Sequence, residues 1–299
     1  MNTAATPSPP REVAAKFSTK NLGPPRPFPT TRMRLIFICC MVLGCLASVN
    51  SVPVEAAPHR PSLTIPYAPS APPISADPRN PIWSRGALIP ALTLSIGPDA
   101  KGLSPLPTQV RVLWNHDYLF VRFVCFGGDL YSPVKGHDAP LFKGDVAEVF
   151  IDPVGDGRQF VELEVSPNNS VLDILHLITG PPASGPDGVL LAQVIGRNMW
   201  SFPEWNMDGL ITATGHLTRA GKVRGWIVDM AIPASSLLKR LGTSHYSPMT
   251  LRANFVRYDQ LPGPTPGGPR KFIAMNWSPV VWGRPHRAPR AMGMLRLLP

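Results

Sequence analysis

The sequence predicts an all-β protein, an antiparallel β-sandwich of the immunoglobulin-like kind, from three observations. Short runs of alternating apolar residues recur between turn residues along most of the chain. Prolines number 38 and charged residues make up only 16%, which is typical of β-rich folds with irregular connections. Only residues 234–241 have a helical pattern, and Pro233 suits the first turn of that short helix. Many strands and almost no helices favour a single sandwich domain.

The first 57 residues are expected to be a disordered extension followed by a secretory signal peptide. An apolar run at 35–47 follows Arg32 and Arg34, and it is shorter than the roughly 20 residues of a membrane-spanning helix. Small residues at Ala56 and Ala57 then indicate a cleavage site. The mature protein is therefore expected to be secreted or periplasmic, and to meet a membrane only transiently through the signal peptide.

The state of the cysteines depends on this processing. Cleavage near Ala56 would remove Cys39, Cys40 and Cys45, and Cys125 would remain without a disulfide partner. Cys125 lies in an apolar strand and is expected to be a small buried hydrophobe. A lipoprotein anchored through Cys45 is a less favoured alternative, because the residues before it match a lipoprotein cleavage sequence only loosely. The start could be Met1 or Met33.

The mature chain divides into a Pro-rich segment, 58–82, and a sandwich domain, 83–299. The first is expected to be an extended linker or an edge strand, and Trp83 is expected to enter the core beside it. The strands predicted from alternation cover 109–115, 118–126, 144–152, 158–165, 171–177, 189–195, 210–216, 223–232, 250–258, 271–277 and 292–298.

A net charge of +10 raises the question of nucleic-acid binding. Much of the excess lies before residue 35, in the segment expected to be removed. A second basic cluster near the C-terminus comprises Arg284, Arg287, Arg290 and Arg296. No nucleic-acid recognition motif surrounds it, so a solvated basic rim is the favoured interpretation and no nucleic-acid partner is expected.

Side chains alternate across a strand, and this sorts the acidic residues into faces. Glu148 lies on one face of its strand, while Glu162 and Glu164 share a face of the next strand. If these strands pair as a hairpin, the three carboxylates stand together on the exposed face of one sheet. Arg252 and Asn254 have matching parity on a later strand.

These five residues suit either a sugar site or a plain solvated surface with ion pairs, and the two interpretations carry equal weight. Catalytic motifs such as a nucleophile elbow or a zinc-binding His-Glu-x-x-His are not found in the sequence. The histidines are expected to make ordinary polar contacts. Asp129, Asp138 and Asp145 form a weak candidate for a calcium site, and the sequence indicates no other cofactor.

The chain resembles the family 9 carbohydrate-binding modules and their wider relatives, through an ordered series of segments. The series consists of Asp77-Pro78 to Trp83, 108–114, 118–121, Gly144-Asp145-Val146-Ala147-Glu148-Val149-Phe150-Ile151-Asp152-Pro153, 160–168, Gly225-Trp226-Ile227-Val228-Asp229-Met230-Ala231-Ile232-Pro233, Asn276-Trp277-Ser278-Pro279, His286 and 293–297. Single segments are common in proteins, whereas the ordered series is fairly specific and covers nearly everything after the Pro-rich segment.

The resemblance implies a β-sandwich related to the DOMON superfamily and non-catalytic binding of an oligo- or polysaccharide. In the family two tryptophans sandwich the sugar. This chain has Phe142 at the first position, and Trp282 is the nearest candidate for the second. The carboxylate in the acidic strand matches Glu148. Relatives often accompany domains that degrade xylan or cellulose, so a role in polysaccharide catabolism is expected.

Two other functions remain open. DOMON relatives include haem-binding electron-transfer proteins, and Met207, Met230 and Met275 are available as axial ligands. Alternatively, the chain is a cell-surface scaffold that has lost sugar binding. The favoured hypothesis is a secreted, non-catalytic carbohydrate-binding module that uses Phe142 and Trp282 for stacking.

Overall fold

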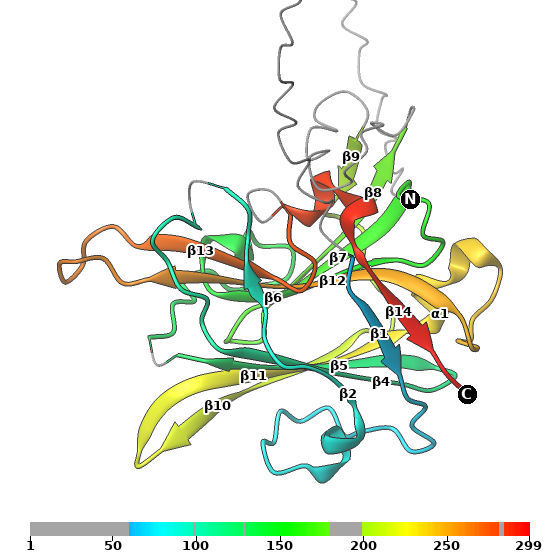
Figure 1. Cartoon of the computed structure of the whole chain (residues 1–299), viewed down its shortest axis with the longest axis horizontal. Coiled ribbons are helices and arrows are strands. Elements are labelled where there is room, and N and C mark those ends of the chain that lie inside the picture. The colour runs from blue at the N-terminus through cyan, green and yellow to red at the C-terminus, as the bar shows by residue number, and fades with distance from the viewer. Residues whose placement is uncertain (1–59, 98–99, 128, 180–198, 281–283) are drawn as a thin grey trace, which may run out of the picture. The chain divides into compact units, whose positions relative to one another are not determined.

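A computed structural model describes residues 60–97, 100–127, 129–179, 199–280 and 284–299. Two β-sheets, one of nine strands and one of five, form the two layers of the domain. In Figure 1, strands β12, β6, β7 and β13 belong to the upper layer, and β10, β11, β5 and β4 belong to the lower layer. The prediction of an all-β sandwich is therefore confirmed. The predicted signal peptide and the predicted strand 189–195 lie outside the described residues.

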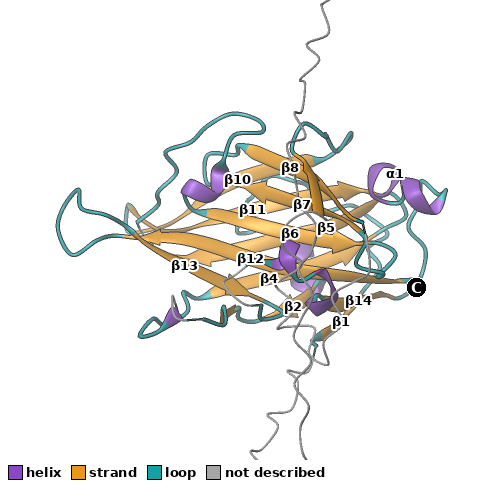
Figure 2. Ribbon diagram, turned by 90° about the horizontal axis from the view of Figure 1, so that it is seen from above, coloured by secondary structure: helices purple, strands orange, loops and turns teal. Residues whose placement is uncertain are grey.

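The nine-stranded sheet carries the central strands of the acidic region. Its order is β1 (Ser62–Ile65), β14 (Gly293–Leu297), β12 (Thr250–Leu261), β6 (Val146–Asp152), β7 (Gln159–Val165), β8 (Val171–Ile178) and β9 (Met199–Phe202). Strand β12 pairs with β14 near its start and, from residue 256 onward, with β13 (Lys271–Asn276). Strand β13 also pairs with β3 (Thr93–Leu94). Figure 2 shows the long strands of this sheet running side by side. Pairing is antiparallel except between β1 and β14, which are parallel.

The five-stranded sheet has the order β10 (Ile211–Arg219), β11 (Lys222–Pro233), β5 (Tyr118–Phe126), β4 (Thr108–Trp114) and β2 (Ala87–Ile89). The helix expected at 234–241 is divided into α1 (Ala234–Leu237) and the 3₁₀ turn η4 (Lys239–Leu241). Further 3₁₀ turns are η1 (Pro81–Arg85), η3 (Leu141–Lys143), η5 (Pro285–Arg287) and η6 (Pro289–Ala291). Within the described residues, no helix has the length and apolar character needed to cross a membrane.

The main core lies between the two sheets. Val161, Leu163 and Val165 point into it from β7, as the alternation of that strand predicts. Phe123 of β5 meets Phe255 of β12 edge to face across the layer, with ring centroids 6.1 Å apart. Cys125 lies in the same core and is fully buried, as its apolar strand predicts.

The outer face of the nine-stranded sheet is also buried, and the prediction of an exposed face is therefore wrong. A second apolar cluster covers it, with Phe150, Phe160 and Val256 contributed by the strands. Leu141 and Met292 pack onto these residues from loops outside the sheet. The sequence explains this burial, because apolar residues share this face of the strands with the acidic ones. These apolar side chains are buried by the loops that pack over the sheet.

A buried ion pair ties the Pro-rich segment to the five-stranded sheet. Asp229 accepts two hydrogen bonds from the Arg122 guanidinium, at 2.6 Å and 2.8 Å, and another from the backbone N–H of Ala76 at 2.8 Å. The Arg122 guanidinium stacks on Trp83, which is buried as expected. Residues 75–83 are therefore fixed on the outer side of this sheet by one charged cluster.

Three short strands were not predicted. Strands β2, β3 and β9 contain two to four residues each, too few for an alternating pattern to be recognised. Trp200 on β9 is 57% exposed because β9 is the last strand of the sheet. Trp205 packs partly buried against the main core.

Candidate functional site

A cavity of about 590 Å³ opens on the outer side of the nine-stranded sheet. Its lining combines three aromatic rings, two carboxyl groups and three basic side chains. These residues are Phe142, Glu162, Glu164, Tyr258, Phe272, Arg284, His286 and Arg287. The volume falls within the range of small-molecule sites, roughly 300–1,000 Å³. This cavity is the candidate functional site.

Different elements supply the aromatic rings. Phe142 stands on the turn η3, just before the acidic strand, and 48% of it is exposed. Tyr258 and Phe272 come from the paired strands β12 and β13, with ring centroids 4.9 Å apart in an edge-to-face arrangement. Phe142 and Phe272 are exposed and Tyr258 is buried beside Phe272; exposed aromatic faces at a cavity are suited to contact with the C–H face of a sugar ring.

Strand pairing brings the three predicted carboxyl groups together. Glu148 of β6 lies opposite Glu164 of β7, and Glu162 lies two residues away on the same face. One carboxylate oxygen from each falls within 4.8 Å of the others. All three residues are buried rather than exposed, with Glu148 completely inaccessible. Glu162 and Glu164 line the cavity, and Glu148 lies beneath them.

Histidines hold one of these carboxyl groups in place. His176 Nε2 lies 2.7 Å from Glu162 Oε2, and its Nδ1 lies 2.9 Å from the hydroxyl of Ser201. The His176 ring is stacked between Phe160 and His286, with centroid distances of 4.8 Å and 5.9 Å. The His286 Nδ1 atom lies 3.8 Å from Glu162 Oε2. His176 thus makes the ordinary polar contacts that were expected of it.

The three carboxyl groups differ in their affinity for protons. Burial, together with the charges of Glu164 and Glu162, raises the pKa of Glu148 well above its ordinary value. Burial and the adjacent Glu162 likewise raise the pKa of Glu164. Burial also acts on Glu162, but the hydrogen bond from His176 and the imidazole of His286 outweigh it, and the pKa of Glu162 is lowered. Within the cluster, Glu162 therefore favours the carboxylate form more than its two neighbours do.

Arg252 and Asn254 share the outer face of the sheet but do not line the cavity. Asn254 is fully buried, and its amide both donates to the carbonyl oxygen and accepts from the N–H of Ser278, at 2.8 Å and 2.9 Å. Arg252 donates to the carbonyl oxygen of Arg290 at 2.9 Å. Both side chains thus hold loops against the sheet. Trp282 lies outside the described residues.

Sequence reasoning did not assign Phe272, Arg284, His286 or Arg287 to the site. Phe272 reaches it through the register of β13 against β12, which cannot be read from either strand alone. Arg284 and Arg287, expected only in a solvated rim, come from η5 and the residue before it and line the cavity. Tyr258, which has the same parity as Arg252 and Asn254 on β12, lines the cavity, whereas those two do not.

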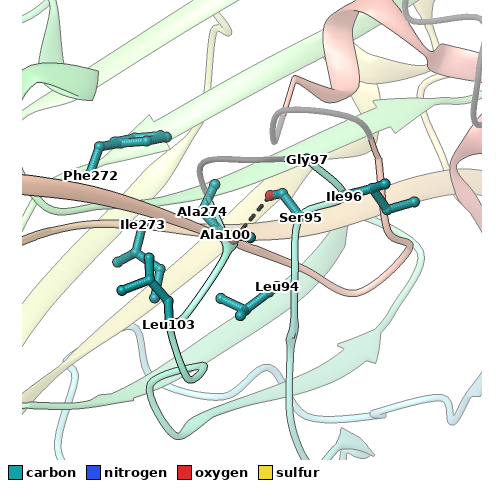
Figure 3. Close-up of a pocket in the computed structure, with 9 residues that line it drawn as sticks. All are labelled: Leu94, Ser95, Ile96, Gly97, Ala100, Leu103, Phe272, Ile273 and Ala274. Atoms are coloured by element: carbon teal, nitrogen blue, oxygen red, sulfur yellow. Dashed lines mark hydrogen bonds between the residues drawn. The ribbon is translucent and has the colours of Figure 1, made fainter.

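A second hollow, between β3 and β13, is too small for a sugar. Figure 3 shows its apolar lining, with Leu94, Leu103 and Ile273 among the labelled side chains. The Ser95 hydroxyl points across it and donates to the Ala274 carbonyl oxygen at 3.0 Å. Its volume is about 20 Å³, about the space of one water molecule.

The aspartates considered for calcium do not converge. Both oxygens of Asp145 accept backbone N–H groups, from Tyr131 at 2.7 Å and from Gln260 at 2.8 Å. Asp129 pairs with Arg270, and Asp138 pairs with His137. Asp145 therefore acts as a backbone clamp beside the acidic strand.

The methionines considered for haem ligation lie in the main core. Met207, Met230 and Met275 are at most 4% exposed and pack between the sheets. The Met275 sulfur also accepts a hydrogen bond from the N–H of Leu106, at 3.1 Å. None of the three lines the cavity.

The chain is similar to several solved structures. No family model and no curated protein matches it. A putative carbohydrate-binding protein from Bacteroides uniformis matches with a TM-score of 0.55 and 14% identity, over 80% of this chain and 100% of the other. The chain shares the fold of that protein.

Two further structures are of a family 9 carbohydrate-binding module from Caldicellulosiruptor kristjanssonii. The complex with glucose has a TM-score of 0.50 and 14% identity, over 80% of this chain and 96% of the other. The complex with cellotriose has a TM-score of 0.50 and 13% identity, over 79% and 93%. The fold of the chain is therefore like that of a family 9 module, as the ordered series of segments predicts.

Proposed function

We propose that this protein binds a saccharide, without catalysis, in the cavity lined by Phe142, Tyr258 and Phe272. The observation that carries the proposal is that three aromatic rings, two carboxyl groups and two guanidinium groups meet around one cavity. A sugar needs both kinds of surface, since its C–H face packs on rings and its hydroxyls need donors and acceptors. The fold likeness to a family 9 module in complex with glucose and with cellotriose supports the same conclusion.

Each polar group has a definite part in this proposal. Glu162 is the hydrogen-bond acceptor for sugar hydroxyls, because His176 fixes it and its pKa is lowered chiefly through that hydrogen bond, against the effect of burial. Arg284 and Arg287 also line the cavity, and their guanidinium N–H groups donate hydrogen bonds to sugar oxygens. An equatorial hydroxyl pair can then bridge acid and guanidinium groups while the ring rests on an aromatic face.

The arrangement of acids favours binding over hydrolysis. A glycosidase places two carboxyl groups on either side of the scissile bond. Here the two acids that line the cavity, Glu162 and Glu164, are neighbours on one face of β7, and a hydrogen bond between them contributes to both pKa shifts. They therefore approach a ligand from the same side.

The proposed ligand is a β-linked glucan or xylan fragment, bound by a protein secreted after cleavage near Ala56. The signal-peptide pattern motivates the location, and the fold likeness to a module bound to cellotriose motivates the ligand. In this proposal the protein assists polysaccharide catabolism by holding the polymer, and another protein cleaves it.

Affinity electrophoresis in gels containing soluble β-glucan or xylan tests the site. The Phe142→Ala and Phe272→Ala double variant is expected to bind the polysaccharide at least about tenfold more weakly, because two stacking contacts of about 1 kcal/mol each are removed. Its retardation in the gel is expected to fall accordingly. Phe126→Ala is the matched control, since Phe126 is a similarly exposed aromatic residue at the end of β5 and does not line the cavity. Equal retardation of the double variant and the unmodified protein would show that the cavity is not the site.

A further inference from the structure

The carboxyl group of Glu148 has an environment that saccharide binding leaves unexplained. It is fully buried, it does not line the cavity, and neither of its oxygens has a hydrogen-bond partner. Glu164 Oε2, directly across the strand pair, is also buried without a partner. Unpartnered buried carboxyl oxygens are costly, so their persistence calls for an occupant between them. A sugar in the cavity does not reach Glu148, and the occupant must be smaller.

The geometry of the cluster matches a metal ion. One oxygen each from Glu148, Glu162 and Glu164 lies within 4.8 Å of the other two. Three atoms that are at most 4.8 Å apart fit within a circle of radius about 2.8 Å. An ion at the centre of that circle therefore lies no further than about 2.8 Å from each of the three oxygens. Metal–oxygen bonds to divalent cations measure about 2.0–2.6 Å. Side-chain shifts of a few tenths of an ångström therefore bring all three carboxyl oxygens within bonding distance of one ion.

The surroundings supply further features of a metal centre. His176 fixes the Glu162 carboxylate through Nε2 and is itself held by Ser201, which is the kind of outer support that orients metal-binding carboxylates. The His286 Nδ1 atom is buried, has no hydrogen-bond partner and lies 3.8 Å from Glu162 Oε2. This atom lies outside the set of ligand atoms that are all within 4.8 Å of one another, so it becomes a nitrogen ligand through a shift of its ring toward the cluster.

We propose that Glu148, Glu162 and Glu164, with His286 at the side, form a divalent-cation site beneath the floor of the cavity. Three carboxylates and one imidazole favour Mn²⁺ and related ions, because carboxylates suit Mn²⁺ and imidazole suits the transition metals. The bound ion neutralises the buried acids and fixes the two that line the cavity. This site is separate from the His137, Asp138 and Asp173 group, of which two members are exposed.

The test is a titration of the full-length, EDTA-treated protein with Mn²⁺ near neutral pH, in which electron paramagnetic resonance measures the free ion. We expect one Mn²⁺ ion bound per chain at the cluster, and at least about tenfold weaker binding in Glu148→Gln. Asp138→Asn, which alters the other acidic group, is expected to leave this binding unchanged. Competition by Ca²⁺ and Zn²⁺ identifies the preferred ion.

Thermal unfolding separates a metal ligand from a residue needed for folding. Without metal, Glu148→Gln is expected to be at least as stable as the unmodified protein, because an unpartnered buried acid is removed. With Mn²⁺, only the unmodified protein and Asp138→Asn are expected to melt at higher temperature. If Glu148→Gln fails to fold, Glu164→Gln takes its place in both measurements.

Two results would overturn the proposal. One is the absence of saturable Mn²⁺, Zn²⁺ or Ca²⁺ binding up to about 1 mM, the weakest range of protein calcium sites, which would mean that protons alone occupy the cluster. The other is binding that survives in Glu148→Gln and disappears in Asp138→Asn. No saccharide enters this experiment, so its outcome is independent of the proposed sugar binding.

Discussion

Replacing Asp229 by alanine is expected to lower the free energy of unfolding by about 3–5 kcal/mol, because it leaves a buried guanidinium group without its counter-charge. Arg122 is 3% exposed and donates two hydrogen bonds to this carboxylate. The backbone N–H of Ala76, also bound to Asp229, would lose its acceptor. Urea unfolding followed by tryptophan fluorescence measures the change.

Asp77→Ala is the matched control for this prediction. Asp77 forms an ion pair with Arg79 in the same segment, but both side chains are exposed, at 40% and 88%. Exposed pairs contribute little to stability, because water screens their charges. A loss in Asp229→Ala no larger than that in Asp77→Ala would mean that the Arg122 cluster does not anchor residues 75–83.

Replacing Gly225 by alanine is expected to lower the free energy of unfolding by about 3 kcal/mol or more, because two strands meet too closely at this position. A Cβ atom at Gly225 would lie 2.2 Å from the carbonyl oxygen of Cys125 and 3.0 Å from the Cα of Phe126. Both are backbone atoms of β5, which pairs with β11, so neither can move without disturbing the ladder. Differential scanning calorimetry measures the loss.

Gly221→Ala separates crowding from backbone conformation. Gly221 has a φ of +69° in the turn between β10 and β11, and a Cβ atom there meets nothing within 4 Å. Its replacement is expected to cost about 1–2 kcal/mol for the left-handed conformation alone. Equal losses at the two glycines would contradict the importance of the close approach between β11 and β5.

The sequence predicts the long strands because their alternation is locally visible. The same alternation brings Glu148 next to Glu164, since consecutive strands joined by a short turn form a hairpin. The turn itself is recognisable, and Asp152 stabilises it by accepting from the N–H groups of Gly155 and Gly157, each at 2.7 Å. This part of the candidate site follows from local patterns.

The other half of the site depends on contacts between distant segments. Arg284, His286 and Arg287 lie on a short 3₁₀ turn and the residue before it, and no periodic pattern in the sequence indicates which strands such a turn will cover. The exposure of the acidic face also could not be derived from parity, because parity assigns a face but not what packs on it. Asn254, a polar residue of the correct parity, is used to hold Ser278.

The central claim is that the cavity over β7, β12 and β13 binds a saccharide. Titration calorimetry of the protein with glucose, cellotriose and xylotriose tests it most directly, with the Phe142→Ala and Phe272→Ala double variant measured alongside. We predict saturable binding of at least one of these sugars at one site per chain, and its loss in the double variant. A folded protein that releases or absorbs no heat of binding with any of the three sugars would contradict the claim.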